Sequence, residues 1–315
     1  MIVILDNNAY RDLVSSVTLS EVDAVVGELG AEQYAHGHLS VASPIVAMEL
    51  LARLRDPGTP AFEAALKAIV ALVRNCEDSR QPVSPIRIRM DPDADMCLAL
   101  FHRLPPDAQA NIDQLTWLLK RVTGLRGQNL GQRECELVQA IADHVDTKEQ
   151  SFISDTFKRV VKPLNPDIGS WEEFQRRPDL SPAVLEALSQ EEWSRTFARV
   201  QVLKAADALG LNPTEADIEE RTTWLRQYVK APFALYTEVM KRVIVNGARL
   251  TAKNRANWFW DIHILFGVGR EHTTENQPIL LVTSDADMVD AATKSGAGTV
   301  VASYEEYRRC IAQTP

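Results

Sequence analysis

Four short apolar runs, two near each end of the chain, interrupt an otherwise mixed pattern of polar and apolar residues. Residues 2–5 (IVIL) and 279–282 (ILLV) are apolar without a break, which is typical of parallel strands buried on both faces. Residues 39–42 and 299–301 carry shorter strand-like runs. Helical spacing of apolar residues follows these runs, so both ends of the chain predict strands that alternate with helices.

Helices are predicted along most of the remaining chain, because apolar residues recur about every three or four positions. The predicted helices cover 45–54, 62–73, 96–104, 115–122, 137–145, 193–209, 224–245 and 254–268, with two more from 285 to about 294 and from 303 onward. Strands at both ends around a helical middle indicate one α/β domain. Residues 1–60 and 251–315 would form this domain, and an all-α insertion over 61–250 would split it.

The chain has 315 residues and a formal net charge of −9. Residues 1–60 carry eight acids and three bases, and residues 261–315 carry eight acids and four bases, so the acidic excess lies in the two ends. This balance argues mildly against nonspecific nucleic-acid binding unless cations neutralise the carboxylates. No apolar run reaches the roughly 18 residues that span a membrane. Four scattered cysteines without metal-ligand spacing indicate reduced thiols, and we expect a cytoplasmic protein.

Four acidic residues stand in strongly apolar surroundings. Asp6 follows the first strand run, Asp285 follows the third, and Glu49 and Asp261 lie inside apolar helices. Burying a carboxylate costs several kcal/mol unless it is paired or bound to a cation. Two of the four lie at the carboxyl ends of predicted strands, where α/β sheets bind their ligands. The four acids are therefore candidates for a shared site.

Each acid also has a simple structural interpretation. Asp6 and Asp285 fit helix N-caps, and Glu49 fits an ion pair with Arg53 one turn later. Asp261 could face solvent. These interpretations are adequate one by one, but the acids also recur in a particular order along the chain.

That order resembles the PIN-domain nucleases. The motifs that carry the resemblance are Asp6-Asn7-Asn8, Ser43-Pro44-Ile45-Val46-Ala47-Met48-Glu49-Leu50, Trp260-Asp261-Ile262, Thr283-Ser284-Asp285-Ala286-Asp287-Met288 and Ser303-Tyr304-Glu305-Glu306-Tyr307. Asn7 replaces the family's Thr, Met288 replaces its Phe, and the gap of 212 residues between Glu49 and Asp261 is far longer than in compact members. The gap puts the third acid in doubt, whereas Asp6 and Asp285 are unaffected.

The resemblance implies a PIN-like three-layer α/β domain that hydrolyses phosphodiester bonds with Mg²⁺ or Mn²⁺. Carboxylates suit these hard cations, and two ions can stabilise both the attacking and the leaving oxygen. Asp6 and Asp285 would be the primary ligands, Glu49 and Asp261 would hold a second ion, and Asp287 is a further candidate ligand. Four carboxylates without metal would repel one another, so we expect raised pKa values.

The implied substrate is single-stranded or structured RNA, which makes an endoribonuclease the leading hypothesis and a deoxyribonuclease the weaker one. Relatives include toxins and defence effectors restrained by a protein partner, so an inhibitory partner stays open, as does a homodimer. Candidate substrate contacts are Asn8 and Thr283 beside the acids, and Lys241, Arg242, Lys253 and Arg255 in a run of bases before Asp261. The alternatives are helix caps for the first pair and a solvated helix face for the bases.

Two further sequence features have the same double interpretation. Lys120, Arg121, Arg126 and Arg133 form a second basic cluster that could contact a nucleic-acid backbone or simply face solvent. Trp258, Phe259 and Trp260 could stack on bases, but their helical spacing is more typical of core residues.

Two other functions compete with the nuclease. One is a catalytically inactive PIN-like scaffold that binds RNA or a protein, although a scaffold needs no buried acids. The other is a phosphatase of the haloacid-dehalogenase type, but Asn8 stands where that family has the second Asp of its D-x-D turn. An EF-hand at 91–102 is excluded, because Met96 and His102 replace the required Gly and Glu.

Overall fold

The computed structural model describes residues 1–77, 86–126, 130–245, 257–268, 278–294, 296 and 298–313. Its sheet has four parallel strands in the order β2-β1-β3-β4. The strands are β1 (Ile2–Leu5), β2 (Leu39–Ser40), β3 (Ile279–Thr283) and β4 (Val301–Ser303). The predicted parallel sheet is confirmed; β2 is shorter than predicted, and β4 begins two residues later.

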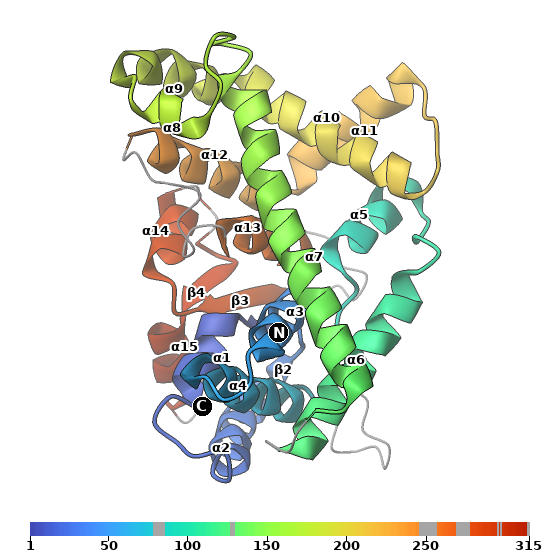
Figure 1. Ribbon diagram of the computed structural model, residues 1–315, viewed down its shortest axis with the longest axis vertical. Coiled ribbons are helices and arrows are strands. Elements are labelled where there is room, and N and C mark those ends of the chain that lie inside the picture. The colour runs from blue at the N-terminus through green and yellow to red at the C-terminus, as the bar shows by residue number, and fades with distance from the viewer. Residues whose placement is uncertain are drawn as a thin grey trace.

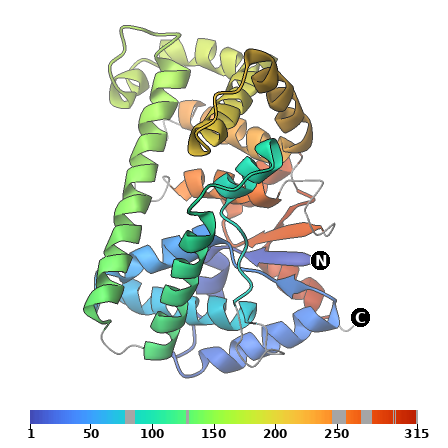
Figure 2. The same cartoon turned by 90° about the vertical axis from the view of Figure 1, so that its right-hand side faces the viewer.

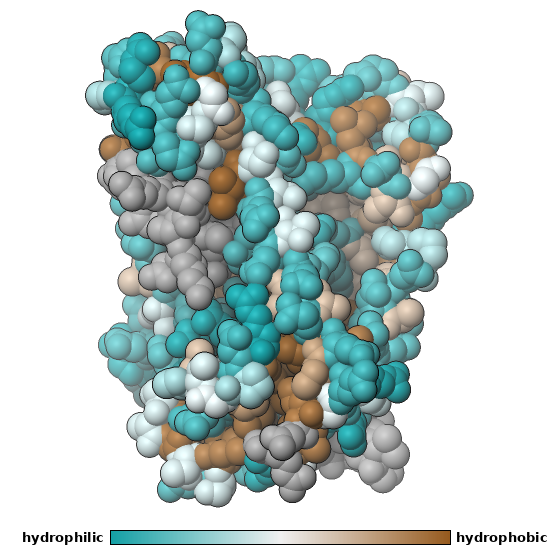
Figure 3. Space-filling view, viewed as in Figure 1, coloured by the Kyte–Doolittle hydropathy of each residue, from teal (hydrophilic) through white to brown (hydrophobic). Residues whose placement is uncertain are grey.

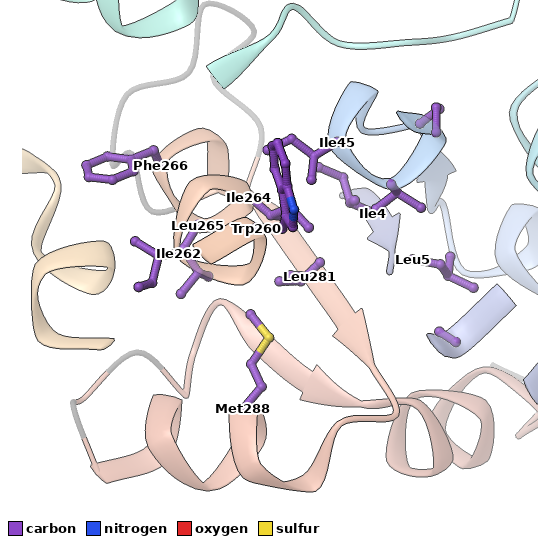
Figure 4. Close-up of a cluster of buried hydrophobic side chains, with 14 of the residues drawn as sticks. Ile4, Leu5, Ile45, Trp260, Ile262, Ile264, Leu265, Phe266, Leu281 and Met288 are labelled. Carbon is purple, nitrogen blue, oxygen red and sulfur yellow. The ribbon is translucent and has the colours of Figure 1, made fainter. Parts of the chain in front are cut away.

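The two central strands are buried because they contain almost nothing but large apolar residues. β1 pairs along its whole length with β3, from Ile2 opposite Ile279 to Leu5 opposite Val282. Figure 4 shows Ile4 and Leu5 of β1 and Leu281 of β3 among side chains from the neighbouring helices. The uninterrupted apolar runs in the sequence therefore reflect strands that helices bury, rather than strands with one face exposed to solvent.

The first part of the chain forms helices around these strands. They are α1 (Asn7–Leu13), α2 (Val22–Ala35), α3 (Pro44–Ala52), the 3₁₀ helix η1 (Arg53–Arg55) and α4 (Pro60–Cys76). Ser43 is the N-cap of α3, as predicted, although its hydroxyl makes no capping bond. Helix α2 escaped prediction, because Gly27 and Gly30 lower its helix propensity, and it forms by packing on α4.

The middle of the chain is helical throughout its named elements, as predicted. These are α5 (Pro92–Phe101), α6 (Ala108–Leu125), α7 (Gln132–Thr156), the π-helical turn η2 (Phe157–Val161), α8 (Trp171–Gln175), the 3₁₀ helix η3 (Pro178–Leu180), α9 (Ser181–Ser189), α10 (Glu191–Ala208), α11 (Glu215–Tyr228) and α12 (Lys230–Val245). The single helix predicted over 224–245 is wrong. Pro232 cannot donate the backbone bond that a continuous helix needs there, and instead it lies in the first turn of α12.

The last part of the chain returns to the sheet with α13 (Asn257–Val268), α14 (Ala286–Lys294) and α15 (Tyr304–Ile311). Helix α14 is followed by Gly296, whose φ of 80° favours glycine, at the predicted stop. The predicted cap at Ser303 is present: its hydroxyl accepts from the Glu306 N–H at 3.2 Å and donates to the Glu306 carboxylate at 2.8 Å.

The sheet and its nearest helices lie in the lower half of Figure 1, and α8 to α11 gather at the upper end. Helix α7 runs from one end to the other in Figure 1 and along the left edge of Figure 2. Its lower half packs against α3 and α6, so a helix of the predicted insertion contacts the sheet domain directly. Figure 3 shows the same face of the molecule as Figure 1. This face is mostly hydrophilic, with hydrophobic side chains gathered in its lower part.

All four cysteines are free, as predicted. Within the described ranges, no helix combines the length and apolar character required to cross a membrane.

Candidate active site

Asp6 lies where β1 ends and α1 begins, at the carboxyl edge of the sheet. Its side chain is 4% exposed and N-caps α1, with Oδ1 accepting from the Ala9 N–H at 2.6 Å. Its other oxygen, Oδ2, accepts a short hydrogen bond from the Thr283 hydroxyl of β3. The predicted cap is thus real, and the same carboxylate also joins the two central strands.

Asp285 reaches the same edge from the neighbouring strand. Its backbone N–H donates to Thr283 Oγ1 at 2.9 Å, and its Oδ1 accepts from the N–H groups of Asp287 at 2.8 Å and Met288 at 3.1 Å, which caps α14. A chain of hydrogen bonds therefore runs from Asp285 through the fully buried Thr283 to Asp6. β1 and β3 flank the point where strand connections diverge to opposite sides, which is the usual ligand site of such sheets.

Glu49 is the third acid that the structure brings to this region. It is partly buried on α3, and its pKa is raised to about 8, mainly by burial. Asp6 and Glu149 raise this pKa further, whereas Arg53 lowers it. Arg53 therefore acts on Glu49 electrostatically, but burial outweighs this effect, and the predicted ion pair between the two side chains stays a prediction.

Burial also raises the pKa of Asp6 to about 7. The bonds from Thr283 and Ala9 oppose this rise, and the nearby Asp285 adds to it. Raised pKa values were expected from mutual repulsion, but desolvation is the larger cause for both Asp6 and Glu49. Without a cation, each carboxyl group is held in a setting that favours the protonated form.

Glu149 of α7 joins this cluster, although the sequence did not identify it. Its Oε1 accepts from the Trp260 indole N–H at 3.0 Å, and burial raises its pKa. Arg53, whose pKa is lowered by burial, is close enough for Glu49 and Glu149 to oppose that shift. The proximity of Glu149 to Glu49 and Arg53 could not be predicted from the sequence, since no local pattern links position 149 to position 49.

The structure leaves part of the predicted set open. Asp261 lies on α13, but its side chain is outside the described residues, and so are Lys253 and Arg255 altogether. Asn8 is partly buried on α1 one turn beyond β1. Asp287 is exposed, with its carboxylate 3.5 Å from Arg242.

The two predicted phosphate-binding bases on α12 differ in their contacts. Arg242 contacts the carboxylates of Glu238, Asp287 and Asp290, so its guanidinium ties α12 to α14. Lys241 is partly buried on α12. A nucleic-acid role for Lys241 stays a prediction, whereas binding through Arg242 would require these ion pairs to open.

The second basic cluster also contains paired side chains. Arg121 contacts Glu134 at 2.9 Å, and Arg126 contacts Asp23. Trp260 is 4% exposed and belongs to the core, which confirms the structural interpretation for this tryptophan. The side chains of Trp258 and Phe259 lie outside the described residues.

The donors at the strand ends suit a hard cation, but they do not form a complete cage. Among the described side chains, no group of three His, Cys, Asp or Glu residues lies close enough to hold a metal ion. Two oxygens beside the acids, Asn7 Oδ1 and Ser284 Oγ, are buried without a hydrogen-bond partner in the same part of the chain. Buried oxygens are normally satisfied, so these two are candidate donors to an ion held by Asp6 and Asp285.

Comparison of the chain with protein-family models, with curated proteins and with solved structures finds no match.

Proposed function

We propose that this protein is a metal-dependent nuclease, with RNA as the substrate and internal phosphodiester bonds as the target. One observation carries the proposal: Asp6 and Asp285, from the ends of adjacent parallel strands, share a hydrogen-bonded path through Thr283. The resemblance to PIN-domain nucleases implies acids directly after these two strands. We extend the proposal to a PIN-like three-layer domain with an inserted helical region.

The residues of the site divide the work by position. Asp6 and Asp285 would hold Mg²⁺ or Mn²⁺, and Thr283 would fix the orientation of the Asp6 carboxylate. The bound ion would supply an activated water and neutralise charge on the phosphate. Glu49, with its raised pKa, lies near enough to Asp6 to respond to the same cation.

The deciding experiment is a cleavage assay on labelled single-stranded RNA and matched DNA, with Mg²⁺, Mn²⁺ or EDTA. Asp6→Asn and Asp285→Asn should each lose at least a hundredfold in rate while remaining folded. Asp12→Asn is the matched control, because Asp12 is an exposed carboxylate on the same helix that Asp6 caps. Asp12→Asn should retain activity.

The assay separates the competing outcomes. Cleavage of RNA alone identifies a ribonuclease, and equal cleavage of DNA corrects the substrate class. If the folded Asp6→Asn and Asp285→Asn variants cut as well as the wild type, the site is wrong.

A PIN-like scaffold without catalysis is the second candidate. The observation in its favour is that the described His, Cys, Asp and Glu side chains make no group of three suited to a metal. Such a scaffold would bind RNA or a protein partner equally well in EDTA and Mg²⁺. Metal-independent binding together with no cleavage under any condition would favour it over the nuclease.

A further inference from the structure

A pocket of about 500 Å³ lies between α3, α5, α6, α7 and α13. Pockets that hold small organic groups usually measure roughly 300–1,000 Å³. Ile45 and Met48 of α3 and Leu118 of α6 give it apolar walls, and Trp260 of α13 adds an aromatic one. Figure 4 shows the Trp260 ring beside Ile45. The pocket therefore suits a flat organic group.

The pocket shares its walls with the candidate active site. Three residues that line it come directly before an acid, in the pairs Met48–Glu49, Lys148–Glu149 and Trp260–Asp261. Consecutive residues of a helix point about 100° apart, so α3 and α7 each turn one side to the pocket and the adjacent side to the acids. The bond from the Trp260 indole to Glu149 joins the pocket wall to that acidic cluster.

The polar part of the pocket mixes acceptors and donors but carries more negative than positive charge. Three carboxylates, from Asp91, Asp93 and Asp107, stand against one lysine, Lys148, and the remaining polar lining comes from Asn111, Gln114, His144 and His263. Asp91 caps α5 by accepting from the Asp93 N–H at 2.9 Å, which leaves acceptor positions on a carboxylate that has about four. Burial and the nearby Asp93 raise the pKa of Asp91, whereas the backbone N–H groups of Asp93 and Ala94 and the charge of Lys148 lower it. Because three carboxylates face one lysine, a neutral ligand that donates hydrogen bonds fits this lining better than an anion does.

We propose that this pocket receives an unpaired guanine base of RNA, with the Asp91 carboxylate accepting from the base's N1–H and 2-amino group. Guanine is the base whose Watson–Crick edge presents these two donors side by side. Adenine and cytosine place a bare ring nitrogen next to their amino group, and uracil flanks its N–H with two carbonyls, so each would set acceptors against Asp91. Contact with the apolar walls of Ile45, Met48 and Leu118 would hold the ring, because proteins that take up splayed-out bases place them against aromatic or apolar side chains.

Base binding follows from the pocket alone, whereas its link to cleavage rests on the proposed nuclease function. Calorimetric titration in EDTA with guanosine, inosine, adenosine, cytidine and uridine tests the binding. Inosine is the matched probe, because it lacks only the 2-amino group. Guanosine should bind saturably at up to millimolar concentration, and each of the other nucleosides should bind at least tenfold more weakly.

Two variants and a control keep the binding test decisive. Ala140→Trp places a large ring in the pocket from the exposed face of α7 and should abolish guanosine binding. Asp91→Asn should weaken binding at least tenfold, and Asp113→Asn, an exposed position on α6, should leave it unchanged. No guanosine binding, equal binding of all five nucleosides, or unchanged binding by folded Ala140→Trp would overturn the proposal.

Cleavage of RNA oligonucleotides that carry a single guanosine separates this inference from the proposed function. Cutting beside that guanosine, with the preference lost in Ala140→Trp, supports both. Guanosine binding without cleavage of any RNA would retain the pocket and remove the nuclease. Metal-dependent cleavage without a guanosine preference or guanosine binding would retain the nuclease and remove the pocket's role.

Discussion

Thr283 is the residue on which the geometry of the site depends most directly. Its hydroxyl donates to Asp6 and accepts from the Asp285 N–H, and its side chain is fully buried. No other residue type of that size supplies both a donor and an acceptor while filling the same volume. The position is therefore sensitive to a change that removes only the hydroxyl.

Thr283→Val should lower the free energy of unfolding by about 1–3 kcal/mol, because it leaves a buried carboxylate oxygen and a backbone N–H unpaired. It should also reduce metal-dependent cleavage at least tenfold, since the Asp6 carboxylate loses its orientation. Urea unfolding and the RNA assay measure the two effects. Thr293→Val is the control: Thr293 is exposed and its hydroxyl donates to the Val289 carbonyl of the same helix, so its loss should cost little. Similar losses in both variants would contradict the prediction.

Asp6 should make stability depend on pH. Its folded pKa of about 7 lies above the ordinary 3.8, so between these values the folded state holds a proton that the unfolded state has lost. In EDTA, the free energy of unfolding should therefore fall as pH rises from about 4 to 7. Asp6→Asn should remove this contribution, on the order of a few kcal/mol, and become more stable relative to wild type at pH 8 than at pH 4. A constant difference across this range would refute the assignment.

At the residue scale, the sequence identified the acids that follow strands but not those that arrive from distant helices. Asp6 and Asp285 could be predicted because an acid directly after a buried apolar run is rare and its place on the sheet edge follows from the strand. Glu149 could not be predicted, since α7 carries many acids and only the tertiary contact with Trp260 distinguishes this one. The ion pairs of Arg242 with Asp287 and Asp290 could not be predicted either, because they depend on the tertiary packing of α12 against α14.

At the scale of the elements, α3, α7 and α13 meet around the acids, and the Trp260–Glu149 bond joins two of them. The local pattern of each helix was readable, because its apolar spacing is strong. The break between α11 and α12 was missed because the apolar spacing continues through Pro232, while the lost backbone bond ends the helix. Periodicity thus finds helices more reliably than it finds their ends.

Trp260→Phe should keep most of the packing around α13 but remove the donor to Glu149. With Glu149→Gln and the double variant, it forms a cycle whose coupling energy should be about 1 kcal/mol, because Glu149 is only partly buried. Guanidinium unfolding of the four proteins measures the coupling. Additive effects of the two substitutions would mean that the bond contributes nothing to stability.

At the scale of the whole molecule, the parallel sheet and the large helical middle region agree with the predicted order of strands and helices, whereas the division into domains stays a prediction. The packing of the middle on that domain was beyond prediction, because each helix shows an apolar face but not its partner. Helix α7 packs on α3 and brings Glu149 to the acids, so the helical region contributes to the candidate site itself.

A cation that binds the folded site should stabilise the whole chain. Mn²⁺ or Mg²⁺ at about one hundred times its dissociation constant should add about 2.7 kcal/mol to the free energy of unfolding and raise the melting temperature. EDTA should reverse the shift, Asp6→Asn should abolish it, and Asp12→Asn should preserve it. An equal shift in Asp6→Asn would place the cation elsewhere.

The pairing of β1 with β3 also bears on how the protein is made. Thr283 and Asp6 are 277 positions apart, so the first strand leaves the ribosome long before its central partner has been synthesised. Contacts of such long range form late and slowly. The nascent chain must therefore wait with an incomplete sheet, and the two acids meet only after residues 279–285 have left the ribosome. If the protein cuts RNA, this order of assembly keeps it inactive while it is still attached to the messenger and the ribosome.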